Sequence, residues 1–456
     1  MANTYLQRNM ANSLTTDWTV SMWVKRNEIV RQQMLFSAYN NSSYDTEAFF
    51  DGDKLNFRNK RNGSFVFQVK TNRLFRDVNS FYHLVFQFHA SGDSGVYAKI
   101  FVNGVQETDL NVNTQGSGET TWNNDKSHSI GSTVNGGADH FNGIISHMHF
   151  ASTGIYAPSV FGEYDANGVW KIKTSPTFTP GSNGFTILKD GNTITDQSTN
   201  SNDFSLGSGT LTKTEDNASN LFATWNSLSP TASNFTLSNG NTKVYRSGTV
   251  NPGQAIYGQT IMPTTGKWYV EAKIVEQPGG DAGRLGIANF ESIPGDMVQT
   301  PQSSSPSSVN AVEVSFGTSG VVFFTINGTD TENSSAPSFS NGNIIMLAVD
   351  CDNGKFYVGS QGNWWNYSSS ATGGDPTSGS GYVSNSSDLF NGSPICFHQG
   401  HSTGTSKTSA LEWNFGNGYF GTTAVSSAGT NASGIGIFEY DVPTGYTALS
   451  TKGLNL

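Results

Sequence analysis

Short runs in which apolar and polar residues alternate, separated by turn-forming residues, recur along this chain of 456 residues. The run 18–24, WTVSMWV, places Trp18, Val20 and Met22 on one face and the residues between them on the other. The runs 65–70 and 83–89 follow the same pattern. Because successive side chains of a strand point to opposite faces, a period of two predicts β-strands.

The segment 96–108 has the form strand, turn, strand, with Asn103 and Gly104 at the turn. A two-residue hairpin turn needs positive φ at both central positions, and Asn and Gly adopt that conformation most easily. Further strands are expected at 141–150, 184–190, 202–214, 267–276, 283–290, 310–316, 321–328, 344–359 and 410–416.

The composition favours the same fold class. Charged residues make up only 13% of the chain, whereas glycine occurs 51 times among many Asn, Ser and Thr residues. Such a chain is poor in helix formers and rich in turn formers. We therefore predict an all-β protein of two tandem antiparallel β-sandwiches. The polar segment 215–220, EDNASN, separates two series of strands, and we place one domain at 1–217 and the other at 222–456.

The net charge is −10, and the second half is the more acidic. Nucleic-acid binders are normally basic, so we expect no nucleic-acid partner. The N-terminal residues lack the apolar core of a signal peptide, and no run is apolar and long enough to span a membrane. Cys351 and Cys396 lie in apolar runs. We expect both to be buried, reduced thiols in a chain made in the cytoplasm.

Two carboxylates, Glu163 and Asp165, lie in the stretch VFGEYDANGVW and are spaced like part of a glucanase catalytic motif. Retaining glycosidases need a nucleophile and an acid/base carboxylate close together. The glucanase frame is Glu-x-Asp-x-x-Glu, and Gly168 stands here in place of the second glutamate. Because DANG is a strong turn signature, we predict a turn and no catalytic residue.

No cluster of residues has the spacing of a metal site. His147 and His149 share one face of a predicted strand, but no third histidine or carboxylate has matching spacing. We interpret both as imidazoles on a half-exposed sheet face, and we predict no metal ligand and no cofactor.

Seven cations gather within residues 54–76, although the whole chain has only 25 basic residues. Arginine forks match carboxylates and phosphates, so this cationic cluster is a candidate contact surface for an anionic glycan or an acidic neighbour. The alternative is a strand–turn–strand edge whose charges keep it from pairing with other chains. The residues are Lys54, Arg58, Lys60, Arg61, Lys70, Arg73 and Arg76.

A second binding candidate is the aromatic loop NWWNY, with Trp364, Trp365 and Tyr367. Flat aromatic faces stack on sugar rings and on partner side chains. We predict that Trp365 packs into the core and that Trp364 points outward, which makes Trp364 the better binding residue.

The stretches DWTVSMWVKR, YHLVFQFHASGDSGVYAKIFVNGVQET and FNGIISHMHF resemble the laminin-G-like (concanavalin A-like) jelly roll, in the form found in virion proteins of tailed phages. The second half resembles a SPRY domain, through GKWYVEAKI, the hairpin GNIIMLAVDCDNGKFYVG and the closing LEWNFGNGYFG. Two features depart from the resemblance: ASTGIY replaces an acidic turn, and an insertion rich in Gly, Ser and Ala occupies 421–436. Laminin-G relatives often bind calcium through loop aspartates, but nothing identifies Asp93 or Asp139 as ligands.

The resemblance implies a non-enzymatic virion protein, assembled in the bacterial cytoplasm and expected to be a homo-oligomer. One hypothesis is a tail or capsid appendage that recognises a host-surface glycan. A second is a decoration or cement protein that contacts other virion subunits. A glycan hydrolase is the third, and the glucanase-like frame argues against it.

Overall fold

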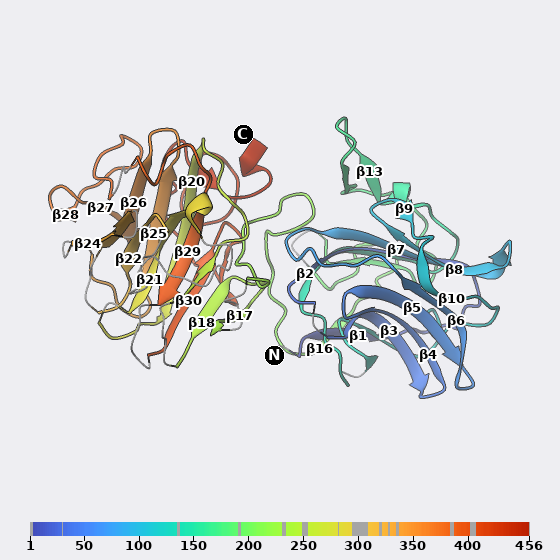
Figure 1. Cartoon of the computed structure of the whole chain (residues 1–456). Coiled ribbons are helices and arrows are strands. Elements are labelled where there is room, and N and C mark those ends of the chain that lie inside the picture. The colour runs from blue at the N-terminus through green and yellow to red at the C-terminus, as the bar shows by residue number, and fades with distance from the viewer. Residues whose placement is uncertain are drawn as a thin grey trace. The chain divides into compact units, whose positions relative to one another are not determined.

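The fold is that of a computed structural model (Figure 1), in which the chain forms two compact units. Unit 1 comprises 1–213 and 217–219, and unit 2 comprises 214–216 and 220–456. The structure describes residues 3–29, 31–134, 137–189, 193–229, 234–248, 254–280, 282–293, 309–318, 322–326, 329–333, 337–383, 387–401 and 407–455. Nearly all of the regular structure is antiparallel strand, so the predicted all-β class is confirmed.

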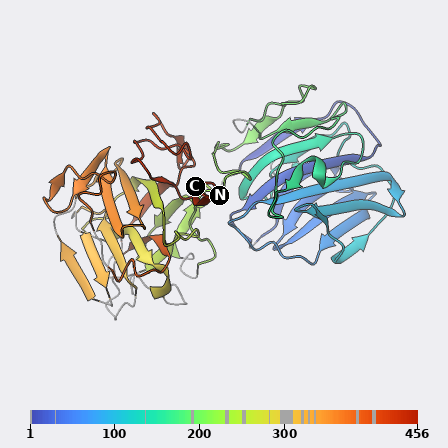
Figure 2. The same cartoon turned by 90° about the horizontal axis from the view of Figure 1, so that it is seen from above.

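Unit 1 is a sandwich of two sheets that enclose one aromatic core (Figures 1 and 2). Alternate residues of the strands point into this core, among them Trp18, Phe36 and Phe57, and Trp122 joins it from the segment between β10 and β11. The Trp18 and Phe57 rings meet edge to face at 5.7 Å between centroids, an arrangement that aromatic pairs prefer. Residues 65–70 and 83–89 lie on strands as predicted, and Asn103 and Gly104 both have positive φ in the predicted hairpin turn.

The eight-stranded sheet of unit 1 has the order β10 (Leu110–Thr114), β6 (Ser64–Thr71), β5 (Lys54–Arg61), β4 (Tyr44–Asp51), β3 (Gln33–Asn41), β11 (Ser127–Ile130), β1 (Tyr5–Asn9) and β16 (Ser205–Ser208). The six-stranded sheet has the order β15 (Phe185–Ile187), β12 (Gly143–Ala151), β2 (Trp18–Arg26), β7 (Tyr82–Asp93), β8 (Val96–Val102) and β9 (Val105–Gln106). A short 3₁₀ turn, η2 (Pro158–Val160), precedes a separate hairpin of β13 (Gly162–Tyr164) and β14 (Trp170–Ile172).

Unit 2 is a second sandwich with its own core, which includes Trp225, Val270, Leu285 and Trp413. One sheet contains β17 (Thr236–Ser238), β18 (Lys243–Arg246), β30 (Ser409–Asn414), β20 (Lys267–Glu276), β25 (Ile344–Asp350), β26 (Lys355–Ser360), β27 (Asn363–Asn366) and β28 (Ala371–Thr372) in this order, with β33 (Thr447–Ala448) also beside β20. The other contains β19 (Gln254–Tyr257), β29 (Ile395–His401), β21 (Gly283–Asn289), β22 (Ala311–Ser315), β23 (Val322–Ile326) and β24 (Thr329–Asn333). Three short elements complete the unit: the hairpin β31 (Tyr419–Phe420) and β32 (Thr423–Ala424), η4 (Phe290–Ser292) and η5 (Gly453–Asn455).

Two details differ from the expectation. β33 pairs with β20 in parallel, so unit 2 is not purely antiparallel. Residues 214–216 group with unit 2 although we placed them in the first domain. Whether 1–217 and 222–456 fold as separate domains stays a prediction.

Candidate functional site

The cationic cluster lies mainly on β5 and β6, on strands that have neighbours on both sides. The alternative of a protected sheet edge is therefore wrong, because β10 covers β6 and β4 covers β5. Six of the seven cations form an ion pair with a carboxylate of unit 1, at N–O distances of 2.5 to 3.3 Å. The pairs are Arg58–Glu47, Lys60–Asp45, Arg61–Glu119, Lys70–Asp51, Arg73–Glu107 and Arg76–Asp53.

Arg58 contacts both a carboxylate and aromatic rings of this surface. It lies directly opposite Glu47 on the neighbouring strand, and its guanidinium stands over the rings of Phe49 and Phe65. Burial raises the pKa of Glu47, and the charge of Arg58 opposes that rise. The pairing neutralises most of the positive charge on which the predicted anion contact depended. The contact itself stays a prediction.

The stretch around Glu163 and Asp165 forms a hairpin, and Asp165 begins its turn as predicted. The Asp165 Oδ1 atom accepts hydrogen bonds from the backbone N–H groups of Asn167 and Val169, at 2.8 and 2.9 Å. These bonds hold the pKa of Asp165 below its usual value. Glu163 lies on β13 rather than in a loop, and its carboxylate faces Lys171 at 3.5 Å. The two carboxylates thus stabilise the hairpin, Asp165 through its turn and Glu163 through an ion pair.

This hairpin, labelled at β13 in Figure 1, is anchored by a stack of three rings. The His83 ring stacks on Trp23 at 4.6 Å between centroids, and the Trp170 ring lies nearly parallel to it at 5.8 Å. Trp170 Nε1 donates to His83 Nδ1 at 3.0 Å, so His83 Nε2 carries the proton and donates to Ser21 Oγ at 2.9 Å. Burial lowers the pKa of His83 to about 3, and the imidazole is therefore neutral.

His147 and His149 do not share a face, contrary to our prediction. A β-bulge between Ser146 and His149, with a positive φ at His147, breaks the alternation of β12. His149 is buried: its ring stacks on Phe161 at 5.5 Å, and its Nδ1 lies 3.0 Å from Thr186 Oγ1. Burial lowers the pKa of His149 to about 3. Within the described residues, no three His, Cys, Asp or Glu side chains are grouped to hold a metal ion.

A pocket of about 300 Å³ opens beside His149, and we call it the His149 pocket. Its size lies at the lower end of the range for small-molecule sites, roughly 300–1,000 Å³. Seven of its ten lining residues carry a hydroxyl, amide, imidazole or ammonium group, and Phe178 and two prolines supply apolar surface. It is lined by His149, Ser175, Pro176, Phe178, Pro180, Thr186, Lys189, Gln197, Ser198 and Thr199.

One side of the His149 pocket is a loop organised by Asp196. The Asp196 carboxylate accepts from the backbone N–H groups of Thr186, Ser198 and Asn202, each at 2.8 Å, and from the Ser198 hydroxyl. These hydrogen bonds fix the loop whose residues 197–199 line the pocket. Composition did not reveal the site, although the series DQSTN, an Asp followed by small polar residues, was a usable signal for such a turn.

Another part of the lining is aromatic. The Phe178 ring is half-buried and meets the rings of Phe161, His149 and Tyr156 edge to face, at 5.3 to 5.9 Å between centroids. A pocket that combines an aromatic ring with hydroxyl and amide groups can hold a ligand that has both C–H faces and hydroxyls.

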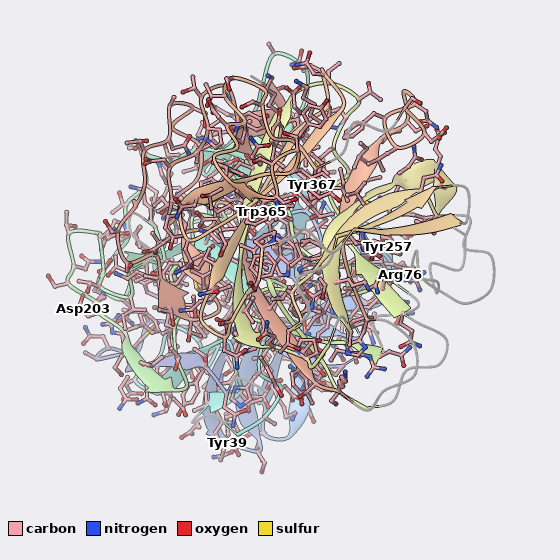
Figure 3. All side chains as sticks on the ribbon, turned by 90° about the vertical axis from the view of Figure 1, so that its left-hand side faces the viewer. Tyr39, Arg76, Asp203, Tyr257, Trp365 and Tyr367 are labelled. Carbon is pink, nitrogen blue, oxygen red and sulfur yellow. The ribbon has the colours of Figure 1, made fainter. Side chains whose placement is uncertain are left out.

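The aromatic loop is oriented opposite to our prediction. Trp364 packs against the core of unit 2 and meets Tyr269 edge to face at 6.2 Å, and Tyr367 also packs there. Trp365, labelled with Tyr367 in Figure 3, is half-buried and is not part of that packing. The reason is register, because Trp364 pairs with Gly359, whose missing side chain leaves room for the indole. Trp365 is therefore the better binding candidate of the two.

Cys351 and Cys396 are buried and free, and burial raises the pKa of each thiol to about 12. Within the described residues, no helix is both long and apolar enough to cross a bilayer.

Comparison with known proteins places the first part of the chain near one family. The model for the Concanavalin A-like lectin/glucanases superfamily matches residues 1–157, which lie in unit 1. No curated protein matches the chain. Unit 1 is thus similar to concanavalin A-like domains over the matched residues.

Several solved structures are similar at low identity. The SPRY domain of human HERC1 has 12% identity and a TM-score of 0.27, covering 39% of this chain and 91% of that chain. Domains LG4-5 of the mouse laminin alpha1 chain have 10% identity and a TM-score of 0.28, covering 97% and 92%. The CBM40 of a Ruminococcus gnavus IT-sialidase, bound to alpha2,3 sialyllactose, has 13% identity and a TM-score of 0.25, covering 35% and 96%. With scores this low, the strand topology alone carries the fold argument.

Proposed function

We propose that this chain is a non-enzymatic glycan-binding protein and that unit 1 binds the glycan in the His149 pocket. The observation that carries the proposal is the lining of this pocket of about 300 Å³, which combines the Phe178 ring with the polar side chains of Gln197 and Ser198. The match of 1–157 to a lectin-containing family supports the proposal.

The chemistry of the pocket suits a sugar. A pyranose ring has C–H groups that pack on an aromatic face and hydroxyls that exchange hydrogen bonds with amides and hydroxyls. The Asp196-centred loop holds its backbone in place before any ligand arrives, which lowers the ordering cost of binding. Lys189 is the one charged side chain among the lining residues.

The finer part of the proposal rests on the sequence resemblance. We propose that the chain is a homo-oligomeric structural protein of a tailed-phage virion, assembled in the bacterial cytoplasm, and that it recognises a host-surface glycan from a tail or capsid appendage. Glu163 and Asp165 support a role without catalysis, because both carboxylates are engaged within their own hairpin.

A glycan array with the purified full chain tests the glycan-binding role. Specific binding is expected, and Thr199→Trp should reduce it at least tenfold, because Thr199 is exposed at the pocket mouth and a bulky ring there closes it. Thr195→Trp, at an exposed site on the same loop but outside the pocket lining, is the matched control. An array without specific binding, or equal binding by the Thr199 variant, contradicts the proposal.

A second candidate, a decoration or cement protein, is favoured by the hairpin tip. The three most exposed large apolar side chains of the described residues are Val169 (59%), Tyr164 (56%) and Val105 (54%). The Tyr164 ring meets Trp170 edge to face, Val169 precedes Trp170 in the chain, and Val105 follows Gly104, which the Trp170 ring contacts. Exposed apolar patches of this kind mark protein contacts. Tyr164→Ser with Val169→Ser should lower incorporation into particles and leave glycan binding unchanged, and normal incorporation would contradict this candidate.

A further inference from the structure

Unit 2 contains a larger pocket, of about 440 Å³, which we call the Lys267 pocket. It opens where the start of β20 meets the turn after β25 and the C-terminal residues. Its polar groups come from Thr265, Lys267, Asp352, Ser433 and Thr447. Its volume falls well within the range for small-ligand sites, roughly 300–1,000 Å³.

The insertion at 421–436, which departs from the SPRY resemblance, supplies one wall of this pocket through Ala432 and Ser433. This wall is tied to the floor, because Thr447 Oγ1 donates to Ser433 Oγ at 3.1 Å. Thr447 itself belongs to β33, which pairs in parallel with β20 at Trp268. The insertion thus completes a defined hollow.

The charges of the Lys267 pocket disfavour an anion. Lys267 Nζ lies 2.8 Å from Oδ2 of the buried Asp350, so the ammonium charge is already neutralised within unit 2. The remaining charge of the lining is the carboxylate of the exposed Asp352. A negatively charged ligand would therefore be repelled.

Asp352 and Thr447 can each accept a further hydrogen bond, whereas the Ser433 hydroxyl is already engaged with Asn431, Ile435 and Thr447. Asp352 Oδ1 accepts from the Gly266 N–H at 2.8 Å, and its Oδ2 accepts no hydrogen bond from any residue that the structure describes. Thr447 gives its only hydroxyl proton to Ser433 and can then only accept. The lining thus offers acceptors at Asp352 and Thr447 and N–H donors of Lys267 beyond the one bonded to Asp350, which suits a ligand whose hydroxyls both donate and accept.

The apolar part of the lining suits the other face of such a ligand. Trp268 and Tyr446 form a buried part of the wall, and Leu454 is exposed at the rim. Hydroxyls that donate, together with a C–H surface and no negative charge, describe a neutral saccharide. From this geometry we infer that the Lys267 pocket is a second carbohydrate site, specific for a neutral sugar residue and independent of the His149 pocket.

The test uses the full chain carrying Thr199→Trp, so that the His149 pocket is closed. The probes are glucose, galactose, mannose and N-acetylglucosamine, with glucuronic acid as the anionic comparison, and binding is followed by saturation-transfer NMR and calorimetry. We expect at least one neutral sugar to bind and glucuronic acid to bind more weakly than glucose.

Ala432→Trp should abolish this binding by filling the pocket, whereas Ala428→Trp, at an exposed position of the same insertion outside the lining, should not. Asp352→Asn keeps an acceptor for the Gly266 N–H and should weaken binding roughly tenfold, because a charge-assisted bond becomes neutral. Circular dichroism checks the fold of each variant.

The inference is overturned if no neutral sugar binds the Thr199→Trp chain, if Ala432→Trp and Asp352→Asn both bind normally, or if glucuronic acid is preferred. This test is separate from the test of the proposed function. Binding in the His149 pocket should be removed by Thr199→Trp and left intact by Ala432→Trp.

Discussion

In each unit, a segment outside the two main sheets is held to one of those sheets by a buried titratable side chain. The segment is the β13–β14 hairpin in unit 1 and the C-terminal stretch around Glu439 and Tyr440 in unit 2. In unit 1, His83 of β7 holds the hairpin through the Trp170 indole. In unit 2, Glu271 of β20 holds the C-terminal stretch by accepting from the backbone N–H groups of Glu439 and Tyr440, at 2.9 and 2.8 Å.

The kind of anchoring side chain follows from the hydrogen-bond donors that each segment presents. The hairpin satisfies its own backbone through β13 and β14 and presents only a side chain, and one neutral imidazole nitrogen suffices as its acceptor. The C-terminal stretch has backbone N–H groups to satisfy, which require the several lone pairs of a carboxylate. Tyr269 and Asn414 complete the hydrogen bonding of Glu271, at 2.9 and 3.4 Å.

The largest effect is expected for Glu271→Ala. Glu271 is fully buried, and its removal leaves two backbone N–H groups without an acceptor, at a cost of about 3 kcal/mol or more in the free energy of unfolding. Urea unfolding of the full chain measures this cost. Glu271→Gln, which keeps one acceptor oxygen, should cost less than half as much, and equal costs would show that the carboxylate does not secure the stretch through these bonds.

Trp170→Ala should cost about 2 kcal/mol, because it removes the stack on His83 and one hydrogen bond. The hairpin should then detach locally, and residues 157–178 should become accessible to proteases while the sheets stay folded. Mass spectrometry of limited digests locates the cuts. Val169→Ala, which shortens the most exposed large apolar side chain of the same hairpin, is the control. Unchanged digestion of the Trp170 variant would contradict the anchoring role.

The two anchors should give opposite pH dependence. Burial raises the pKa of Glu271 from 4.5 to about 7, so between these values the folded state holds a proton that the unfolded state has released, and the free energy of unfolding falls as pH rises. Burial lowers the pKa of His83 from 6.5 to about 3, so the contribution of His83 is present above pH 6.5 and is lost as pH falls.

Each contribution changes by about 1.4 kcal/mol per pH unit inside its window. The readout is the difference between wild type and variant across pH 4 to 8, for Glu271→Gln and for His83→Gln separately. The first difference should decrease with rising pH and the second should increase. Slopes of the same sign would contradict the comparison.

Fragments of the chain test where the boundary between the two units lies. Fragments 1–217 and 222–456 should each unfold cooperatively if the two units are domains. A fragment 214–456 should be about 1 kcal/mol more stable than 222–456, because it retains the hydrogen bonds from Glu215 N to Asn417 O and from Phe222 N to Asp216. Thermal unfolding measures both, and failure of both halves to fold alone would contradict the two-domain prediction.

The smallest effect is expected in the cationic cluster, which unit 2 does not match in density. Arg76→Ser should change the free energy of unfolding by less than about 0.5 kcal/mol, because the Arg76 side chain is 62% exposed. Arg58→Ser should cost about 1 kcal/mol, since it leaves the buried Glu47 unpaired. If replacing Arg58, Arg61, Arg73 and Arg76 together with Ser lowers adsorption to cells, the predicted contact role gains support despite the ion pairs.

Much of the strand pattern was predictable from sequence, for physical reasons that are local. A period of two exposes alternate faces, and Asn103-Gly104 supplies two positive φ angles without help from the rest of the chain. The same holds for the turn at Asp165, whose carboxylate caps N–H groups only two and four residues away. The burial of both cysteines followed from their apolar neighbours.

The errors and omissions concern partners that are distant in sequence. No local signal indicates that Glu107 pairs with Arg73, that a bulge separates His147 from His149, or that Gly359 makes room for Trp364. Both pockets are also absent from the sequence pattern, because each joins residues from separate segments. Sequence alone thus determined which residues form strands and turns, since those choices depend on near neighbours. Only the tertiary structure decided which charges are neutralised and where a ligand fits, because register and packing bring those groups together.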